Sequence, residues 1–340
     1  MSKMYKLLFL TLIFSSTLVS ISSYSWLGMW LGLEINLLSI MPLMQSTKSI
    51  LSSESAIKYF IVQAIASTII MASMILLMNK TQMTSQINIQ SMFLLMMNSA
   101  LVTKMGTAPF HFWFPEVMEG LDWMNCLLIL TWQKIAPMVL LMYNVTFNLF
   151  MTTVIISSMV VSGIMGVNQI SMRKILAYSS INHMGWMLSS MMIMETIWLY
   201  YFLIYSVITI NLAMIMNKMK IFFLNHLYQS MNENPMTKMW FVLNFLSLSG
   251  IPPFLGFLPK WLTIQALVMN EMIMLPIVMI VMTLITIFMY MRISLSTILM
   301  NINEQGWSQT NLWFNSNILS MMNFVAISSL VFVTMMFNTT

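Results

Sequence analysis

Charge is what this sequence of 340 residues has least of, since only 7% of its residues are Asp, Glu, Lys or Arg while 59% are hydrophobic. Soluble domains carry about 25% charged residues. So few charged groups cannot cover a globular surface in water, so lipid must be the solvent for most of the chain. The formal net charge of +5 forms no basic stripe, and we expect no nucleic-acid partner.

Cysteine and nucleotide-binding motifs are scarce as well. The single cysteine, Cys126, excludes an internal disulfide and an iron–sulfur cluster held by the chain's own cysteines. The three histidines, His111, His183 and His226, lie far apart without metal-ligand spacing, and no Walker or Rossmann glycine motif is present. We therefore expect no metal, redox cofactor or nucleotide site on this chain.

Methionine, in contrast, is abundant, with 44 residues. Met packs well but specifies a core poorly, so packing gives little reason to prefer it to Leu or Ile. A genetic code that reads an isoleucine codon as Met, in an AT-rich mitochondrial genome, explains the excess better. The composition therefore indicates a mitochondrially encoded protein.

Long apolar runs fill the chain, and a membrane span needs about 20 predominantly apolar residues. That length predicts an all-α polytopic bundle of about eleven spans, forming a single transmembrane domain over residues 1–340. Lys3 and Lys6 ahead of the first run also fit a signal peptide, but the many later spans favour a retained first helix. The expected spans lie near residues 4–22, 26–45, 57–79, 91–108, 122–143, 148–168, 174–194, 196–217, 239–270, 272–292 and 316–338.

The positive charges predict the orientation of these spans. If the chain changes sides at each span, only Lys80 falls on one face, while Lys104, Lys134 and Lys260 fall inside spans. This asymmetry places the N-terminus on the cytoplasmic or matrix side and the C-terminus on the opposite side. The other face collects Lys3, Lys6, Lys48, Lys58, Arg173, Lys174, Lys218, Lys220, Lys238 and Arg292.

Two segments rich in Pro and Gly interrupt the apolar pattern. The first is Met105–Phe110, followed by the aromatic run Phe112–Pro115, and the second is Ser249–Pro259. Such residues break the helical ladder, and unpaired backbone at membrane depth is tolerated only against protein or a wet cavity. Discontinuous helices at ion sites recur in transporters. We predict two discontinuous helices, with simple proline kinks as the alternative.

Four ionisable side chains, Glu34, Lys104, Lys134 and Lys260, lie inside apolar segments. A charged side chain at the bilayer centre costs about 2.5–3.5 kcal/mol, so such groups are usually functional. Burial lowers a lysine pKa and a nearby carboxylate raises it, so a buried Lys–Glu pair whose separation changes is a candidate proton switch. The alternatives are lysines that extend to the membrane interface and a glutamate that is only a structural partner.

Several other polar residues are weaker candidates. His183 lies mid-span, and its side chain suits either a proton relay or a hydrogen-bonded core position. His111, on the aromatic run, is predicted to be structural. Glu116, Glu119 and Asp122 read as a solvated acidic loop, with Glu119 as a candidate for proton uptake.

Five motifs together point to one known family. The motifs are Trp26–Asn36, Lys104–Pro115, Trp132–Pro137, Ser179–Trp186 and Gly250–Trp261. They resemble the NADH dehydrogenase subunit 2 family, mitochondrially encoded antiporter-like subunits of NADH:ubiquinone oxidoreductase (respiratory complex I). The resemblance spreads over nearly the whole chain, and the length is similar to the shortened, insect-like animal form.

The resemblance implies an antiporter-like fold and a role for each buried ionisable residue. Glu34 and Lys104 would form the coupled carboxylate–lysine pair. Lys134 would be the connecting lysine on the next helix, and Lys260 the terminal lysine on the second broken helix. His183 would lie on the hydrated axis between Lys134 and Lys260.

The resemblance also implies a function and partners. The chain would translocate protons across the mitochondrial inner membrane, with its N-terminus on the matrix side and its C-terminus on the intermembrane-space side. NAD, FMN, iron–sulfur clusters and ubiquinone would be bound by other subunits. Expected partners are membrane-arm subunits of complex I, including neighbouring antiporter-like subunits, and phospholipids such as cardiolipin. The alternatives are a free-standing cation/proton antiporter and a membrane stator whose lysines never titrate.

Overall fold

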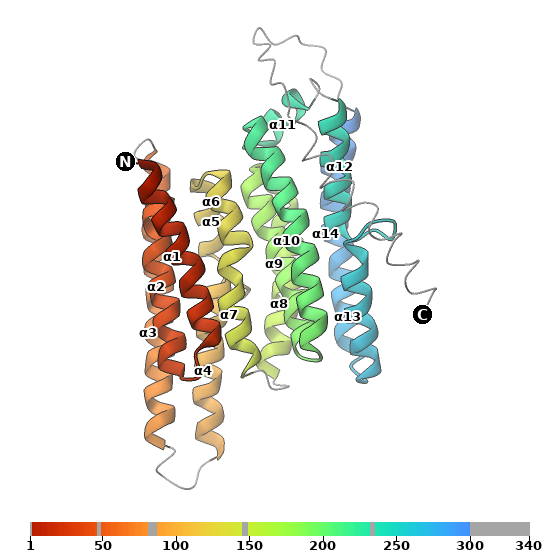
Figure 1. The fold of residues 1–340 in the computed structure, drawn as a ribbon. Coiled ribbons are helices and arrows are strands. Elements are labelled where there is room, and N and C mark those ends of the chain that lie inside the picture. The colour runs from red at the N-terminus through yellow and green to blue at the C-terminus, as the bar shows by residue number, and fades with distance from the viewer. Residues whose placement is uncertain (1, 46–48, 81–86, 145–148, 232–234, 300–340) are drawn as a thin grey trace, which may run out of the picture. The chain divides into compact units, whose positions relative to one another are not determined.

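The structure is a computed structural model that describes residues 2–45, 49–80, 87–144, 149–231 and 235–299 (Figure 1). Within these ranges the regular elements are helices, apart from an isolated β-bridge between Ser171 and Phe223. The all-α prediction is therefore confirmed for the described residues. The contacts group the chain into two units, Met1–Ser158 and Met159–Thr340.

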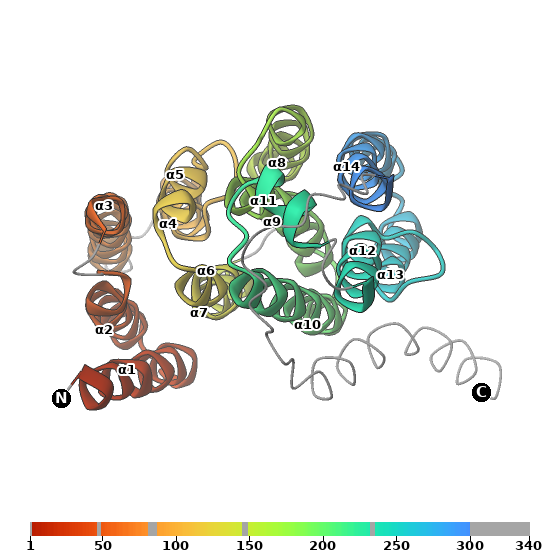
Figure 2. The same cartoon turned by 90° about the horizontal axis from the view of Figure 1, so that it is seen from above.

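Unit 1 contains the first seven helices and the start of the eighth. In Figure 2, α1, α2 and α3 lie side by side in the order of the sequence. The approach of α1 to α2 is close because Gly32 has no side chain, and a Cβ there would come within 2.7 Å of Ser20. The helices are α1 (Ser2–Ser22), α2 (Trp26–Met44), α3 (Ile50–Lys80), α4 (Ile87–Met105), α5 (Trp113–Gly120), α6 (Trp123–Leu130), α7 (Trp132–Met142) and α8 (Leu149–Val167).

Unit 2 contains the end of α8 and six further helices. Although α9 carries Ser179, Ser180, Asn182 and His183, it is buried over nearly its whole length. It packs against α10, α13 and α14, so its polar side chains face other helices rather than lipid. The helices are α9 (Met172–Met191), α10 (Glu195–Met219), α11 (Leu224–Ser230), α12 (Pro235–Ser249), α13 (Phe257–Met269) and α14 (Met274–Leu299).

Seven helical stretches in the described ranges are long and apolar enough to cross a membrane. Two shorter apolar helices, Met92–Met105 and Phe257–Met269, adjoin the segments rich in Pro and Gly. Large apolar side chains remain exposed on the outer helices, as lipid-facing surfaces require. The seven stretches are Met4–Ser22, Trp26–Met44, Ile50–Met78, Trp123–Met142, Leu149–Val167, Glu195–Met219 and Met274–Leu299.

Several boundaries differ from those expected from the sequence. Helix α3 begins at Ile50 rather than near residue 57, so Lys58 lies about two turns inside the helix rather than at its start. The expected span 122–143 is divided into α6 and α7 at Thr131. The expected span 316–338 lies outside the described residues.

Candidate functional site

The first interruption, residues 106–112, separates α4 from α5. Gly106 ends α4 with a φ of +74°, and its amide donates to the carbonyl of Val102 at 3.1 Å. Glycine adopts this left-handed conformation without steric cost, so it is the usual residue at such a helix end. In unit 1, α5 lies above α4 in Figure 1, and the two overlap in the view along the helices in Figure 2.

Lys104 lies in the last turn of α4, just before this interruption, and is 7% exposed. Glu34, on α2, interacts with it electrostatically. The ion pairs among the described residues do not include these two groups, so they are near each other without direct contact. The Glu34 Oε2 atom is buried and has no hydrogen-bond partner within the described residues. The Glu34 carboxylate therefore lies within electrostatic range of Lys104 without forming an ion pair with it.

Lys134 lies on α7 and is 2% exposed. Its Nζ is 5.4 Å from the centre of the Phe114 ring, within the range of a cation–π interaction. Phe114 belongs to α5, the helix that follows the first interruption. Lys134 is therefore close to the same interruption that Lys104 precedes.

A pair of side-chain amides joins the helices that carry Glu34 and Lys134. The Nδ2 of Asn36 donates to Oε1 of Gln133 at 2.8 Å, and the Nε2 of Gln133 donates to Oδ1 of Asn36 at 3.0 Å. Asn36 is buried and Gln133 half-buried, and each side-chain amide supplies the hydrogen-bond partner that the other needs. This reciprocal pair fixes α2 against α7 next to both ionisable residues.

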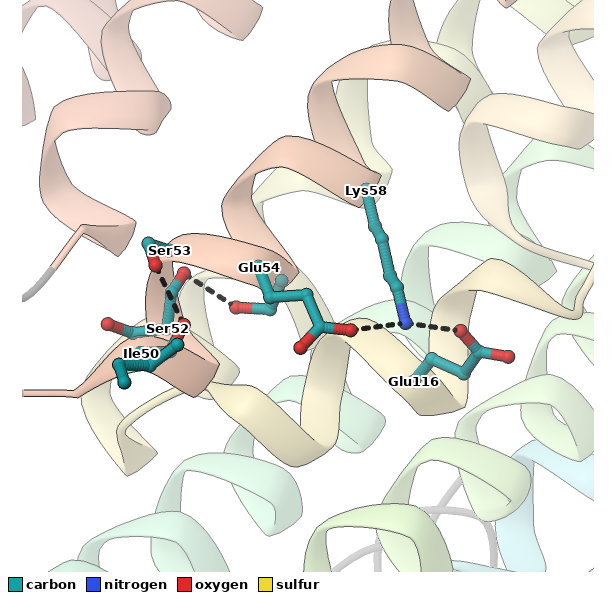
Figure 3. Close-up of polar contacts among 7 residues, drawn as sticks. Ile50, Ser52, Ser53, Glu54, Lys58 and Glu116 are labelled. Carbon is teal, nitrogen blue, oxygen red and sulfur yellow. Dashed lines mark hydrogen bonds and ion pairs between the residues drawn. The ribbon is translucent and has the colours of Figure 1, made fainter.

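An exposed ion-pair cluster connects α3 with α5. The Nζ of Lys58 lies 3.0 Å from Oε1 of Glu54 and 3.0 Å from Oε2 of Glu116 (Figure 3). Glu116 and Glu119 therefore lie in helix α5 rather than in the acidic loop that the sequence suggested. His111 is 5% exposed within the interruption, where its ring lies against Phe112 with ring centres 4.4 Å apart.

The second interruption, residues 250–256, separates α12 from α13. Lys260 lies in the first turn of α13 and is 6% exposed, and its Nζ donates to the carbonyl of Ser249 at 2.7 Å. Ser249 is the last residue of α12, so the lysine after the interruption caps the helix before it. Gly250 has a φ of +78°, and a Cβ there would lie 2.8 Å from the Lys260 Nζ.

His183 lies on α9, also in unit 2, and is 4% exposed. Its Nδ1 is 2.9 Å from the hydroxyl of Tyr201 on α10, at hydrogen-bond distance. One turn along α9, the Trp186 ring lies 6.0 Å from the Lys260 Nζ. Unit 2 thus brings His183 and Lys260 to the same buried part of α9.

The structure distributes the expected site residues between the two units. Glu34, Lys104 and Lys134 are collected in unit 1, while His183 and Lys260 are collected in unit 2. Neutral polar residues near these groups were missed from the sequence, among them Asn36 and Gln133, which bond to each other. Amides in apolar runs are a weak signal on their own, because only the packing of distant helices selects their partners.

Buried lysines beside interrupted apolar helices are typical of membrane proteins that move ions. Ionisable groups inside membrane helices mark ion and proton pathways, and broken helices recur at such sites. The fold and the site therefore describe a helical membrane protein of the ion-translocating class.

Comparison with known proteins specifies the family. Residues 23–286 match the family model described as NADH:quinone oxidoreductase/Mrp antiporter, TM. The chain belongs to this family. It is 46% identical to the NADH-ubiquinone oxidoreductase chain 2 of Anopheles gambiae, over 99% of each chain. It is 47% identical to the chain of the same name from Locusta migratoria, over 89% of this chain and 88% of that one.

Solved structures show the same fold. A chain of respiratory complex I from Thermus thermophilus matches 95% of this chain and 77% of its own length, with a TM-score of 0.86 and 21% identity. A chain of the Mrp complex from Dietzia sp. matches 84% of this chain and 59% of its own length, with a TM-score of 0.74 and 16% identity. The antiporter-like membrane fold expected from the sequence is therefore confirmed.

Proposed function

We propose that the chain is a core membrane-arm subunit of respiratory complex I. It takes part in proton translocation across the mitochondrial inner membrane, coupled to electron transfer from NADH to ubiquinone in other subunits. The insect relatives that match nearly the whole chain bear the name of a subunit of this enzyme. The observation that carries the proposal is the burial of Lys104, Lys134 and Lys260, each beside an interrupted helix.

The proton-translocating residues are Glu34, Lys104, Lys134, His183 and Lys260. Glu34 and Lys104 form a switch: when the carboxylate approaches, it favours the charged lysine, and when it withdraws, burial favours release of the proton. The absence of a direct ion pair between them supports this assignment, because a locked pair could not change its separation. In the order that the resemblance implies, protons then pass along Lys134, His183 and Lys260.

The two interruptions are the midpoints of discontinuous spans, one formed by α4 and α5 and the other by α12 and α13. Helices α5, α12 and α13, and the apolar part of α4 (Met92–Met105), are each too short to cross a bilayer alone, because a span needs about 20 residues. With the span expected at 316–338, we propose about eleven spans that act as one proton-translocating domain over residues 1–340. The N-terminus lies on the matrix side and the C-terminus on the intermembrane-space side, as the Lys and Arg distribution indicates.

The redox chemistry belongs to other subunits, so NAD, FMN, iron–sulfur clusters and ubiquinone are not cofactors of this chain. The partners are other membrane-arm subunits, including neighbouring antiporter-like subunits, and phospholipids such as cardiolipin. Exposed apolar side chains on α1, α3 and α14 support contacts with lipid or with other membrane helices.

Native electrophoresis of gently solubilised mitochondrial membranes tests the assignment. The gel is stained for NADH dehydrogenase activity, and the stained band is analysed by mass spectrometry. We expect peptides of this chain in a very large, active assembly. A chain that migrates alone or in a small oligomer without NADH activity would contradict the proposal and favour a free-standing cation/proton antiporter, which ion exchange in liposomes would then establish.

A further inference from the structure

Helix α3 runs alongside both sides of the first interruption and packs against α4 and α5. On the α5 side, the rings of Tyr59 and Trp113 meet edge to face with centres 5.7 Å apart. On the α4 side, the side chain of Gln63 reaches the end of the helix. A single continuous helix thus contacts both pieces of the interrupted segment.

The Gln63 contact falls on the backbone of Lys104 itself. The Gln63 Nε2 donates to the Lys104 carbonyl oxygen at 3.2 Å, and Gln63 is 5% exposed. Carbonyls in the last turn of a helix have no partner within the helix. At membrane depth no bulk water replaces that partner, so a side-chain donor must do so. The amide of Gln63 supplies the hydrogen bond that the interruption removes.

We propose that Gln63 is a positioning residue for Lys104, holding its backbone in place by capping the Lys104 carbonyl from α3. The inference rests on the proposed role of Lys104 in proton translocation and deepens it. A neutral amide does not titrate, so its hold on the backbone is the same whether Lys104 is charged or neutral. Because Gln63 caps the carbonyl, the Lys104 ammonium is left to interact with Glu34.

The first test replaces Gln63 by Met, which keeps the length of the side chain and removes the donor. The readouts are the amount of assembled complex I on native gels and the rate of NADH-driven proton pumping per assembled complex. We expect a severalfold loss of pumping per complex. A role limited to packing would lower the amount of complex and leave the rate per complex unchanged, and that result would overturn the proposal.

Ser67→Ala is the matched control on the same helix. Ser67 is 2% exposed, its hydroxyl donates within α3 to the carbonyl of Ala64, and its backbone carbonyl accepts the hydrogen bond of Trp30 in either variant. We expect the Ser67→Ala complex to pump like the wild type. An equal loss in both variants would show that any change at this face of α3 has the same effect, and would contradict a specific role of Gln63.

Gln63→Glu gives a second test that does not depend on the first variant assembling. A protonated glutamic acid can still donate to the Lys104 carbonyl, whereas an ionised carboxylate cannot and is repelled by it. Pumping per complex should therefore stay near wild type at the acidic end of the activity range and fall at the alkaline end. A pH profile identical to that of the wild type would overturn the proposal.

The Lys104→Ala complex separates this inference from the function on which it rests. If Lys104→Ala loses pumping and both Gln63 variants pump normally, only the positioning role is wrong. If Lys104→Ala itself pumps normally, the function proposed for Lys104 fails, and the role of Gln63 fails with it.

Discussion

The two interruptions differ in the side chain that caps the carbonyl at the end of the first helix, which is neutral in one and ionisable in the other. In each, a glycine with positive φ, Gly106 or Gly250, follows the first helix, whose last carbonyls have no partner within that helix. At the first interruption a neutral amide from another helix, Gln63, caps the carbonyl of Lys104. At the second, the ammonium of Lys260 itself caps the carbonyl of Ser249.

At the first interruption the ionisable group and the helix cap are different side chains, whereas at the second they are the same side chain. Lys104 can change its protonation without changing the bond that holds the end of α4. A change in the protonation of Lys260 would alter the bond that caps α12, because its side-chain nitrogen both carries the proton and donates that bond. A charged donor makes the stronger hydrogen bond. We infer that removal of Lys260 disturbs structure and function together, while removal of Lys104 disturbs function alone.

The largest effect is expected from Lys260→Met, which removes the charge and the cap at once. A buried carbonyl left without a partner costs about 1–3 kcal/mol, so we expect less assembled complex and loss of pumping. Lys260→Gln is the matched variant, because its amide can still donate to the Ser249 carbonyl. It should restore assembly on native gels without restoring pumping, whereas equal assembly of the two variants would refute the capping role.

A smaller effect is expected from alanine at the two glycines. Gly106→Ala and Gly250→Ala both force a residue with a Cβ into a left-handed conformation, at about 1–2 kcal/mol. The added methyl of Gly250→Ala would meet the Lys260 Nζ at 2.8 Å, while that of Gly106→Ala would meet the ring of Phe114 at 3.0 Å. We predict similar losses of thermal stability but a greater loss of pumping per complex for Gly250→Ala. Equal pumping losses would contradict the distinction between the two interruptions.

The smallest effect is expected from Lys58→Met, which removes the ion pairs between α3 and α5. The Lys58 side chain is 43% exposed, and exposed ion pairs contribute little to stability because water and salt screen them. We predict a slight decrease at most in the temperature at which the complex loses activity, with normal pumping. Lost pumping in this variant would mean that the cluster, rather than Gln63, is the functional link from α3 to the first interruption.

The sequence predicts both interruptions because their cause is local. Gly and Pro break a helix wherever they occur together, so Met105–Phe110 and Ser249–Pro259 could be located without knowing any neighbour. The buried lysines could be located for a similar reason, since a charge inside an apolar run is conspicuous. In the structure α4 ends at Met105 and α12 at Ser249, and Lys104, Lys134 and Lys260 are buried.

The hydrogen-bond partners of the buried polar groups could not be predicted, because these partners depend on packing between distant segments. Gln63 and Lys104 are 41 positions apart, and Asn36 and Gln133 are 97 positions apart. The division of α6 from α7 at Thr131 was also missed, since Leu127–Leu130 before it is apolar and no Gly or Pro lies at that point. Neutral polar residues are frequent in membrane helices, so their presence alone does not identify their partners.

The most direct test of the proposed function is the rate of NADH-driven proton pumping in membranes that carry Lys104→Ala, measured per assembled complex. Gln63 can still cap the backbone carbonyl of residue 104 in this variant, so the end of α4 should be preserved. We predict a complex that assembles in normal amount and has lost coupled proton pumping. Normal pumping per complex would contradict the assignment of Lys104 to proton translocation.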